Sequence, residues 1–207
     1  GWDAIVDAWN ASGYGADGDV VTATPSSEPT VSTAPSYTLA PSPAPSVQPG
    51  PRVANASTFA ELKSVVEAAP ACGEARLRVQ VLDHVRMNTT DTAIAVPENS
   101  CVEVTGTMNS LVGIAGNGGA RIFDAAAKRF SLSNVNLTNA YGDMGGAVSL
   151  SSGVETFMAT RCAFVSCTAT DKGAAIYAAS GLQITLERVV FANNTANRGT
   201  SARAHTF

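Results

Sequence analysis

Apolar and polar residues alternate in short runs over most of the chain from residue 77 onward. The runs are rich in Val, Ile and Leu, and Gly or Asn separates them. Alternation at period two places one set of side chains on a single face of an extended strand. The runs LRVQVL, AIAV, CVEVTG, SLVGIAG, FSLSNVNL and LQITLERVVF are therefore predicted to be strands of an all-β domain.

The alternation recurs in three stretches that begin at Phe130, Phe157 and Ile184, a constant spacing of 27 residues. Within each stretch the apolar positions alternate, skip one extra residue, and alternate again, which predicts two short strands separated by a bend. In the first two stretches a small-residue turn and a further apolar run, AVSL or AAIYAA, complete the repeat. The matched apolar sets are Leu132, Ala159 and Leu186; Val135, Cys162 and Val189; and Leu137, Phe164 and Phe191.

A repeat of this length with several strands predicts a right-handed parallel β-helix of about 27 residues per coil over residues 53–207. A β-sandwich is the alternative, but it has no reason to repeat one inward pattern every 27 residues. One helix is predicted over residues 58–69, because Thr58 and Glu61 fit a capping box and Pro70 follows. We expect this helix to cover the N-terminal end of the solenoid with its apolar face, Phe59, Leu62, Val65, Val66 and Ala69.

The turns of the repeat resemble those of a known family. GGAV at 145–148, GAAI at 173–176 and FANN at 191–194 are similar to the GGA[IV] turn and the Phe-x-x-Asn motif of polymorphic outer-membrane proteins and related β-helix surface proteins. FVSC at 164–167 departs from the pattern, because Cys167 stands where the family has Asn, and the last turn, GTSA, departs too. The resemblance covers about residues 111–207. It implies the fold and little about activity, since β-helices serve adhesins, coats and enzymes alike.

Residues 24–52 have a different composition. The stretch TPSSEPTVSTAPSYTLAPSPAPSVQPGP contains eight of the ten prolines and one charged residue, Glu28. Proline favours polyproline II, so we expect a semi-rigid linker resembling hydroxyproline-rich glycoproteins. The candidate hydroxyprolines are Pro25, Pro29, Pro35, Pro41, Pro43, Pro45 and Pro49. The candidate O-glycosylation sites are Thr24, Ser26, Ser27, Thr30, Ser32, Thr33, Ser36, Thr38, Ser42 and Ser46.

Residues 1–23 form a third segment, which holds both tryptophans of the chain. Tryptophan is costly to leave in water and is enriched at interface hot spots. Two interpretations stay open: the segment folds back onto its own domain as a cap, or it docks into a neighbouring molecule. The interface candidates are Trp2, Ile5, Val6 and Trp9, which would share one face of a helical turn, followed by Val20 and Val21.

Several features favour an oxidising, extracellular compartment. Five Asn-x-Ser/Thr sequons beside a Pro/Ser/Thr tract are typical of a secreted eukaryotic glycoprotein; an unmodified bacterial surface protein is the alternative. The four cysteines allow three pairings, of which we prefer Cys72–Cys101 and Cys162–Cys167, although Cys162 occupies an inward position that also suits a buried free thiol. The candidate N-glycosylation sites are Asn10, Asn55, Asn88, Asn136 and Asn193.

Charge and polar motifs offer little chemistry. The net charge is −4, with no basic patch that indicates nucleic acid, and no apolar run approaches the length of a membrane span. The carboxylates are scattered; Asp143 and Asp171 could stack as a cation or sugar site, but solvated turn residues are the simpler interpretation. Asp17 and Asp19 are interpreted as turn residues, because the rest of a Ca²⁺ loop is missing around them. We expect no catalytic residue, metal or cofactor, and the two histidines, His84 and His205, have no obvious partner.

These observations lead to three functional hypotheses. A solenoid has two open ends, and no capping element is visible before the chain stops at Phe207. The leading hypothesis is a secreted structural glycoprotein that assembles head-to-tail into an extracellular fibre, with the N-terminal arm docking on the next subunit. Its partners are then other copies of itself and covalent glycans. The alternative is a carbohydrate-binding adhesin on a glycosylated stalk, for which Tyr141 and Tyr177 are the suggestive aromatics; a polysaccharide lyase or hydrolase is the third.

Overall fold

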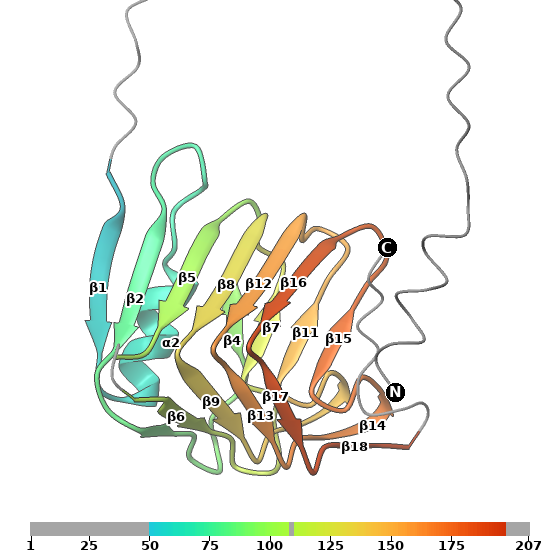
Figure 1. The fold of residues 1–207 in the computed structure, drawn as a ribbon. Helices are drawn as coiled ribbons and strands as arrows, with labels where there is room; N and C mark the ends of the chain where they lie inside the picture. Colours follow the sequence, from blue (N-terminus) through green and yellow to red (C-terminus); the bar gives the residue numbers. More distant parts are fainter. Residues whose placement is uncertain (1–49, 108–109, 198–207) are drawn as a thin grey trace, which may run out of the picture. The chain divides into compact units, whose positions relative to one another are not determined.

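The computed structural model describes residues 50–107 and 110–197 (Figure 1). These residues form a parallel β-solenoid of about five turns with about 27 residues per turn and one short helix. The predicted parallel β-helix is therefore confirmed. The first strand begins at Arg52, one residue before the predicted start of the domain.

The strands stack into four parallel sheets, whose orders run along the solenoid axis. The six-stranded sheet is β1 (Arg52–Ala56), β2 (Leu77–Val81), β5 (Cys101–Thr105), β8 (Arg129–Ser133), β12 (Thr156–Thr160) and β16 (Gln183–Glu187). The five-stranded sheet is β3 (Val85–Arg86), β6 (Val112–Ala115), β9 (Val135–Thr138), β13 (Ala163–Val165) and β17 (Val190–Ala192). The four-stranded sheet is β4 (Ile94–Val96), β7 (Phe123–Ala125), β11 (Val148–Leu150) and β15 (Ile176–Ala178). The three-stranded sheet is β10 (Tyr141–Met144), β14 (Thr168–Lys172) and β18 (Thr195–Ala196).

The sequence repeat is also the structural register. Phe130 of β8 pairs with Phe157 of β12, which pairs with Ile184 of β16. Leu137, Phe164 and Phe191 align in the same way on the second sheet. Because equivalent residues stack at each coil, one alternating pattern per coil builds a continuous interior.

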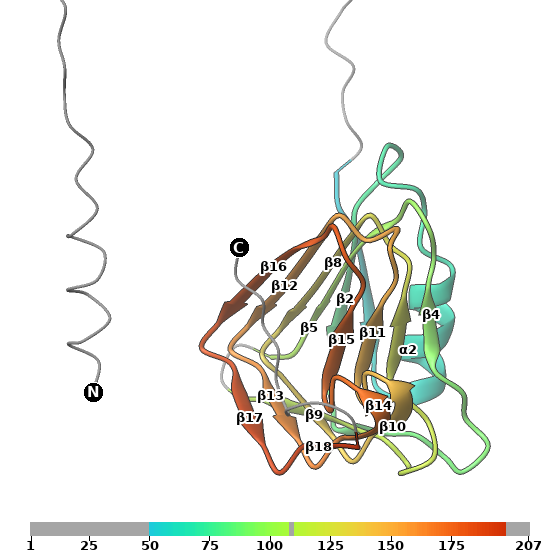
Figure 2. The same cartoon turned by 90° about the vertical axis from the view of Figure 1, so that its right-hand side faces the viewer.

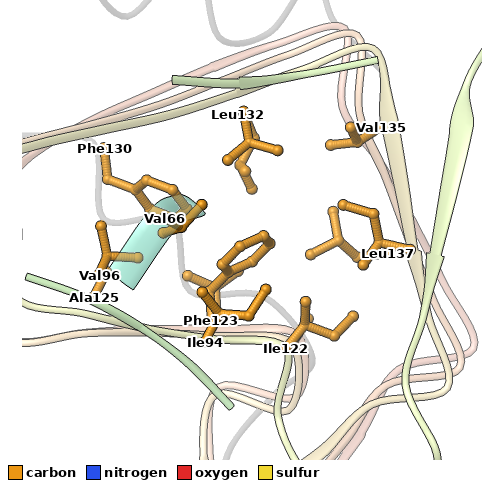
Figure 3. Packing of buried hydrophobic residues seen from close by; sticks show 14 of the residues in the cluster. Val66, Ile94, Val96, Ile122, Phe123, Ala125, Phe130, Leu132, Val135 and Leu137 are labelled. Atoms are coloured by element: carbon orange, nitrogen blue, oxygen red, sulfur yellow. The ribbon is translucent and has the colours of Figure 1, made fainter. Parts of the chain in front are cut away.

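The core lies inside the coils and is almost entirely apolar. Side chains from the different sheets point toward one another there, as the labelled residues in Figure 3 show. The rings of Phe123 and Phe130, from two facing sheets, have centroids 5.2 Å apart, and the ring of Phe130 lies 5.8 Å from that of Phe157 one coil further. Tilted aromatic pairs at such distances add packing energy beyond the area they bury.

The third strand of each later coil differs from the sequence prediction. The three-stranded sheet of β10, β14 and β18 occupies the stretch between the Phe-x-x-Asn corner and the small-residue turn. Its strands are rich in Thr, Asp and Ala and lack the apolar alternation that marks the other strands. The inward residues near it, Ala140 and Ala169, are small, so the hydrophobic pattern carries no signal for it.

The extra residue within each repeat is a corner residue with left-handed backbone. Asn134, Arg161 and Arg188 have φ values of 54°, 52° and 54° and separate the first strand of each coil from the second. A left-handed residue between two strands turns the chain sharply while both strands keep their inward faces. Such positions favour Asn and Gly, and an arginine there indicates that the surrounding pairing enforces the conformation.

The GGAV turn has two separate requirements for glycine. Gly145 has a φ of +74°, which side chains disfavour. Gly146 lies against the next coil, where an added Cβ would come within 2.3 Å of the carbonyl oxygen of Ala174. The family-like motif therefore reflects one unusual backbone conformation and one close approach between coils.

The predicted helix is confirmed as α2 (Phe59–Glu67). The Thr58 side chain accepts from the backbone N–H of Glu61 at 3.2 Å, and the Glu61 carboxylate accepts from the backbone N–H of Thr58 at 3.2 Å, which completes the capping box. The helix packs against β1, β2 and β4 at the N-terminal end of the solenoid (Figure 2). Phe59, Leu62 and Val66 are buried, so the helix closes this end of the core.

One predicted disulfide is confirmed and the other is wrong. Cys72, just after α2, is bonded to Cys101 at the start of β5, and the backbone N–H of Cys72 also donates to the carbonyl of Asn99 at 2.7 Å. Cys162 and Cys167 are both free and buried. The extended strand β13 stands between them and spans about 10 Å, whereas a disulfide requires Cα atoms within about 7 Å. Each of these thiols is a core residue.

Candidate functional site

The C-terminal end of the solenoid differs from the N-terminal end in the burial of its inward side chains. Phe157, Ala159, Cys162 and Phe164 of the fourth coil are at most 1 % exposed. Their equivalents one coil further are only half-buried, although they continue the same inward rows. These equivalents, which we call the end row, are Ile184, Leu186, Val189 and Phe191.

The same end presents the free edges of all four sheets. β15, β16, β17 and β18 are each the last strand of their sheet, and within the described residues no strand pairs with their far side. Parallel strands carry N–H and C=O groups on both edges, so an unpaired edge can accept a further strand. This end therefore exposes both the apolar side chains of the end row and unpaired backbone N–H and C=O groups.

Phe191 shows how a further coil would pack. Its ring stacks on that of Phe164 with a centroid distance of 5.2 Å and an interplanar angle of 12°. The face of Phe191 that points away from Phe164 continues the row. Val190, its neighbour on β17, points outward and is 58 % exposed. An apolar partner could therefore add to Phe191 without contacting Val190.

The Phe-x-x-Asn motif works as a hydrogen-bond bridge between coils. Asn194 Oδ1 accepts from the backbone N–H of Cys167 at 2.9 Å, and Asn194 Nδ2 donates to the carbonyl of Phe164 at 2.9 Å. Cys167 occupies the equivalent position one coil earlier: its sulfur accepts from the backbone of Ala140, and its S–H lies 3.8 Å from the carbonyl oxygen of Leu137 and 3.6 Å from that of Val165. Cysteine at the Asn position therefore preserves the bridge.

Both free thiols are held in the protonated form. Burial raises the pKa of the Cys162 thiol, against the smaller opposing effect of backbone hydrogen bonds at Val135 and Thr160. Burial likewise raises the pKa of the Cys167 thiol, opposed by the Ala140 N–H. A buried protonated thiol is a poor nucleophile and metal ligand, so these residues serve packing.

The candidate N-glycosylation sites occupy different surroundings. Asn55 on β1, Asn88 after β3 and Asn193 at a corner are exposed. Asn136 on β9 is only half-buried as a residue, but its Oδ1 is buried and has no hydrogen-bond partner. It lies in a row between Gly113 and Ala163, which are small enough to let the neighbouring strands enclose it.

Other predicted residues are not brought together into a chemical site. Asp143 accepts a hydrogen bond from Thr170 at 3.2 Å, next to a register shift between β10 and β14. Tyr141 and Tyr177 lie on different sheets, β10 and β15. His84 does have a partner, because its Nδ1 accepts from the backbone N–H of Gly113 at 2.7 Å. Among the described residues, no group of three or more His, Cys, Asp or Glu side chains could hold a metal ion.

Several predictions lie outside the described residues, which begin at residue 50 and end at residue 197. They concern the N-terminal docking segment, the sequon at Asn10, the turn residues Asp17 and Asp19, every candidate hydroxyproline and O-glycosylation site of the linker, and His205. In the part of the chain that is described, no helix is long and apolar enough to cross a membrane.

Comparison with known proteins adds no relative. No protein-family model, curated protein or solved structure matches this chain.

Proposed function

We propose that this chain is a secreted structural glycoprotein that assembles head-to-tail into an extracellular fibre. In this proposal residues 1–23 of one molecule dock on the C-terminal end of the next solenoid, and residues 24–52 act as the spacer between them. The observation that carries the proposal is the half-burial of the end row beside a fully buried preceding coil. An apolar surface of this kind gains stability when another element covers it.

The composition of the N-terminal segment supports this choice of occupant. It contains both tryptophans and a Val-Val pair, Val20–Val21. An extended Val-rich piece suits addition to a free sheet edge, and tryptophan suits burial against the end row. A contact between two different surfaces need not close on itself, so repeated docking produces a filament.

Two variants of the full chain test the proposal. Deleting residues 1–23 should leave a folded solenoid that sediments as a monomer, whereas the intact chain forms fibres visible by negative-stain electron microscopy. Phe191→Ser should weaken assembly, and Val190→Ser, which changes the adjacent outward side chain, should not. Fibres that persist without residues 1–23 would contradict the proposal, as would equal effects of the two serine substitutions.

The residues considered for the adhesin and enzyme alternatives do not come together in one site. The two tyrosines that suggested an aromatic sugar-binding face lie on separate sheets. Among the carboxylates that the structure describes, no group could hold a metal ion.

A further inference from the structure

A cleft of about 290 Å³ lies on the outer face of the six-stranded sheet, near its N-terminal end. Three arginines contribute to its walls: Arg76, Arg78 and Arg129. Glu103 is its one acidic residue, so the lining carries two net positive charges in a chain whose net charge is −4. This local excess of positive charge is unrelated to the C-terminal end and to the fibre proposal.

The strand register brings these arginines together. Arg129 at the start of β8 pairs with Cys101 at the start of β5. On the other side of Cys101, Leu77 of β2 pairs with Val102. Arg76, which precedes Leu77, is therefore level with Cys101. Cys101 is 8 % exposed and is held in the disulfide, so it leaves a gap between the two flanking arginines. Arg78, two residues further along β2, points to the same outer face.

Two of the three guanidinium groups are available to a ligand. Arg78 pairs with Glu103 at 2.9 Å, with both side chains well exposed. Arg76 and Arg129 are exposed, and neither side chain has an ion-pair partner among the residues that the structure describes. Lys128, next to Arg129, is already paired with Glu155 at 3.2 Å. Planar guanidinium groups bind sulfate and carboxylate oxygens through paired hydrogen bonds.

The rows beside the cleft carry hydroxyl and amide groups. Gln80, Thr105, Ser133 and Thr160 lie in register across β2, β5, β8 and β12, and the hydroxyls of Thr105 and Ser133 are 3.0 Å apart. Ser131 lines the cleft itself. The outward positions of these four strands include no aromatic side chain, which argues against stacked nucleic-acid bases and against a protein hot spot. Hydrogen-bonding rows beside a cationic cleft suit a ligand with many hydroxyls and spaced oxyanions.

We propose that this cleft binds an acidic polysaccharide, with Arg76 and Arg129 holding the sulfate or carboxylate of one sugar unit and the hydroxyl row contacting the units beside it. A single exposed site of this kind binds weakly. A polymer that repeats the same anionic unit strengthens the attachment, because a neighbouring unit of the same chain can occupy the cleft when one unit leaves it.

Binding measurements with three polymers test the proposal on the full chain. Dextran sulfate and polygalacturonate supply sulfate and carboxylate, and unsubstituted dextran supplies neither. We expect at least one anionic polymer to bind in affinity electrophoresis or calorimetry and dextran not to bind. Binding of only one anionic polymer identifies the oxyanion. If neither binds more tightly than dextran, the proposal is wrong.

Matched charge variants separate the cleft from general electrostatics. Arg76→Gln/Arg129→Gln should weaken binding by about tenfold or more, since each lost charged hydrogen bond is costly. Arg86→Gln/Lys172→Gln removes the same charge at two exposed positions outside the cleft and should change binding less than about twofold. Equal losses in the two variants would overturn the proposal. Arg76→Lys/Arg129→Lys keeps the charge, and its affinity should lie between those of the wild type and the glutamine variant. Circular dichroism and the melting temperature of each variant show whether its fold is intact.

Discussion

Asn194 and Cys167 occupy the same position in successive coils and make the same two contacts with the coil before. Asn194 donates to the Phe164 carbonyl at 2.9 Å, and the Cys167 thiol lies 3.8 Å from the equivalent Leu137 carbonyl, which shares it with the Val165 carbonyl at 3.6 Å. Each side chain also accepts from the backbone N–H of the residue one coil earlier. The thiol thus replaces an amide in a bridge that links the second sheet of one coil to the next.

This equivalence predicts that Cys167 can be changed to Asn more easily than to Ala. Cys167→Ala removes both contacts and leaves a small cavity at a residue that is 0 % exposed, so we expect a loss of about 2 kcal/mol in the free energy of unfolding. Cys167→Asn restores the donor and acceptor at a cost in packing of about 1 kcal/mol. Urea unfolding measures both values. An Asn variant less stable than the Ala variant would show that the bridge is unimportant.

The two buried thiols predict a dependence of stability on alkaline pH. Burial raises the pKa of Cys162 and Cys167 in the folded state, so folding favours their protonated forms. This contribution is fully present below the thiol pKa of the unfolded chain, near 8.5. It is lost as the pH rises through the higher folded pKa, because the unfolded thiols ionise first.

Urea unfolding at pH 7 and pH 10 tests this dependence. The wild type should lose more stability between the two values than Cys162→Ala/Cys167→Ala, although the double variant is less stable at pH 7. Iodoacetamide should label both thiols only after unfolding. Equal pH sensitivity of the two proteins would contradict the assignment of buried, protonated thiols.

The disulfide predicts a large effect at the N-terminal end. Cys72 and Cys101 are 29 residues apart, and a loop of this length corresponds to about 3–4 kcal/mol of unfolded-state entropy. Cys72→Ser/Cys101→Ser should therefore lower the free energy of unfolding by about that amount and increase hydrogen exchange in α2 more than in β12. Uniform exchange along the solenoid would show that the bond does not hold the cap in place.

The sequons predict unequal glycan occupancy. In a eukaryotic secretory host, Asn55, Asn88 and Asn193 should be modified, since their side chains are exposed. Asn136 should be modified least, because its amide lies between neighbouring strands and its Oδ1 is buried. Glycopeptide mass spectrometry measures the occupancy of each site. High occupancy at Asn136 in folded, secreted protein would contradict this order.

Asn136 also predicts a stabilising substitution. Its buried Oδ1 lacks a hydrogen-bond partner, and such an atom costs about 1–3 kcal/mol. Asn136→Val, in protein made without glycans, should raise the free energy of unfolding by about 1 kcal/mol, because Val also suits a strand. Asn55→Val, at an exposed strand position, is the matched control and should change stability by less.

The sequence by itself determined the fold class, the 27-residue coil and the capping helix. Apolar residues that alternate along each strand and recur at a constant spacing define one inward face. The pattern therefore predicts that Phe130, Phe157 and Ile184 lie at equivalent positions of successive coils. The capping box joins Thr58 and Glu61, which are close in the chain, so the sequence predicts it without knowledge of the tertiary structure. The repeat also predicts that the residues of the end row point inward, since they belong to the pattern.

Only the tertiary structure decided the features that depend on register between coils of unequal length. Leu77 pairs with Val102, a step of 25 residues, and Val102 pairs with Phe130, a step of 28. No constant period in the sequence brings Arg76 and Arg129 to one cleft. The thiols of Cys162 and Cys167, five residues apart, remained unbonded because an extended strand separates them. The polar sheet of β10, β14 and β18 also depends on pairing between neighbouring coils. Its strands are held by backbone hydrogen bonds and have no apolar alternation, so the sequence pattern does not predict them.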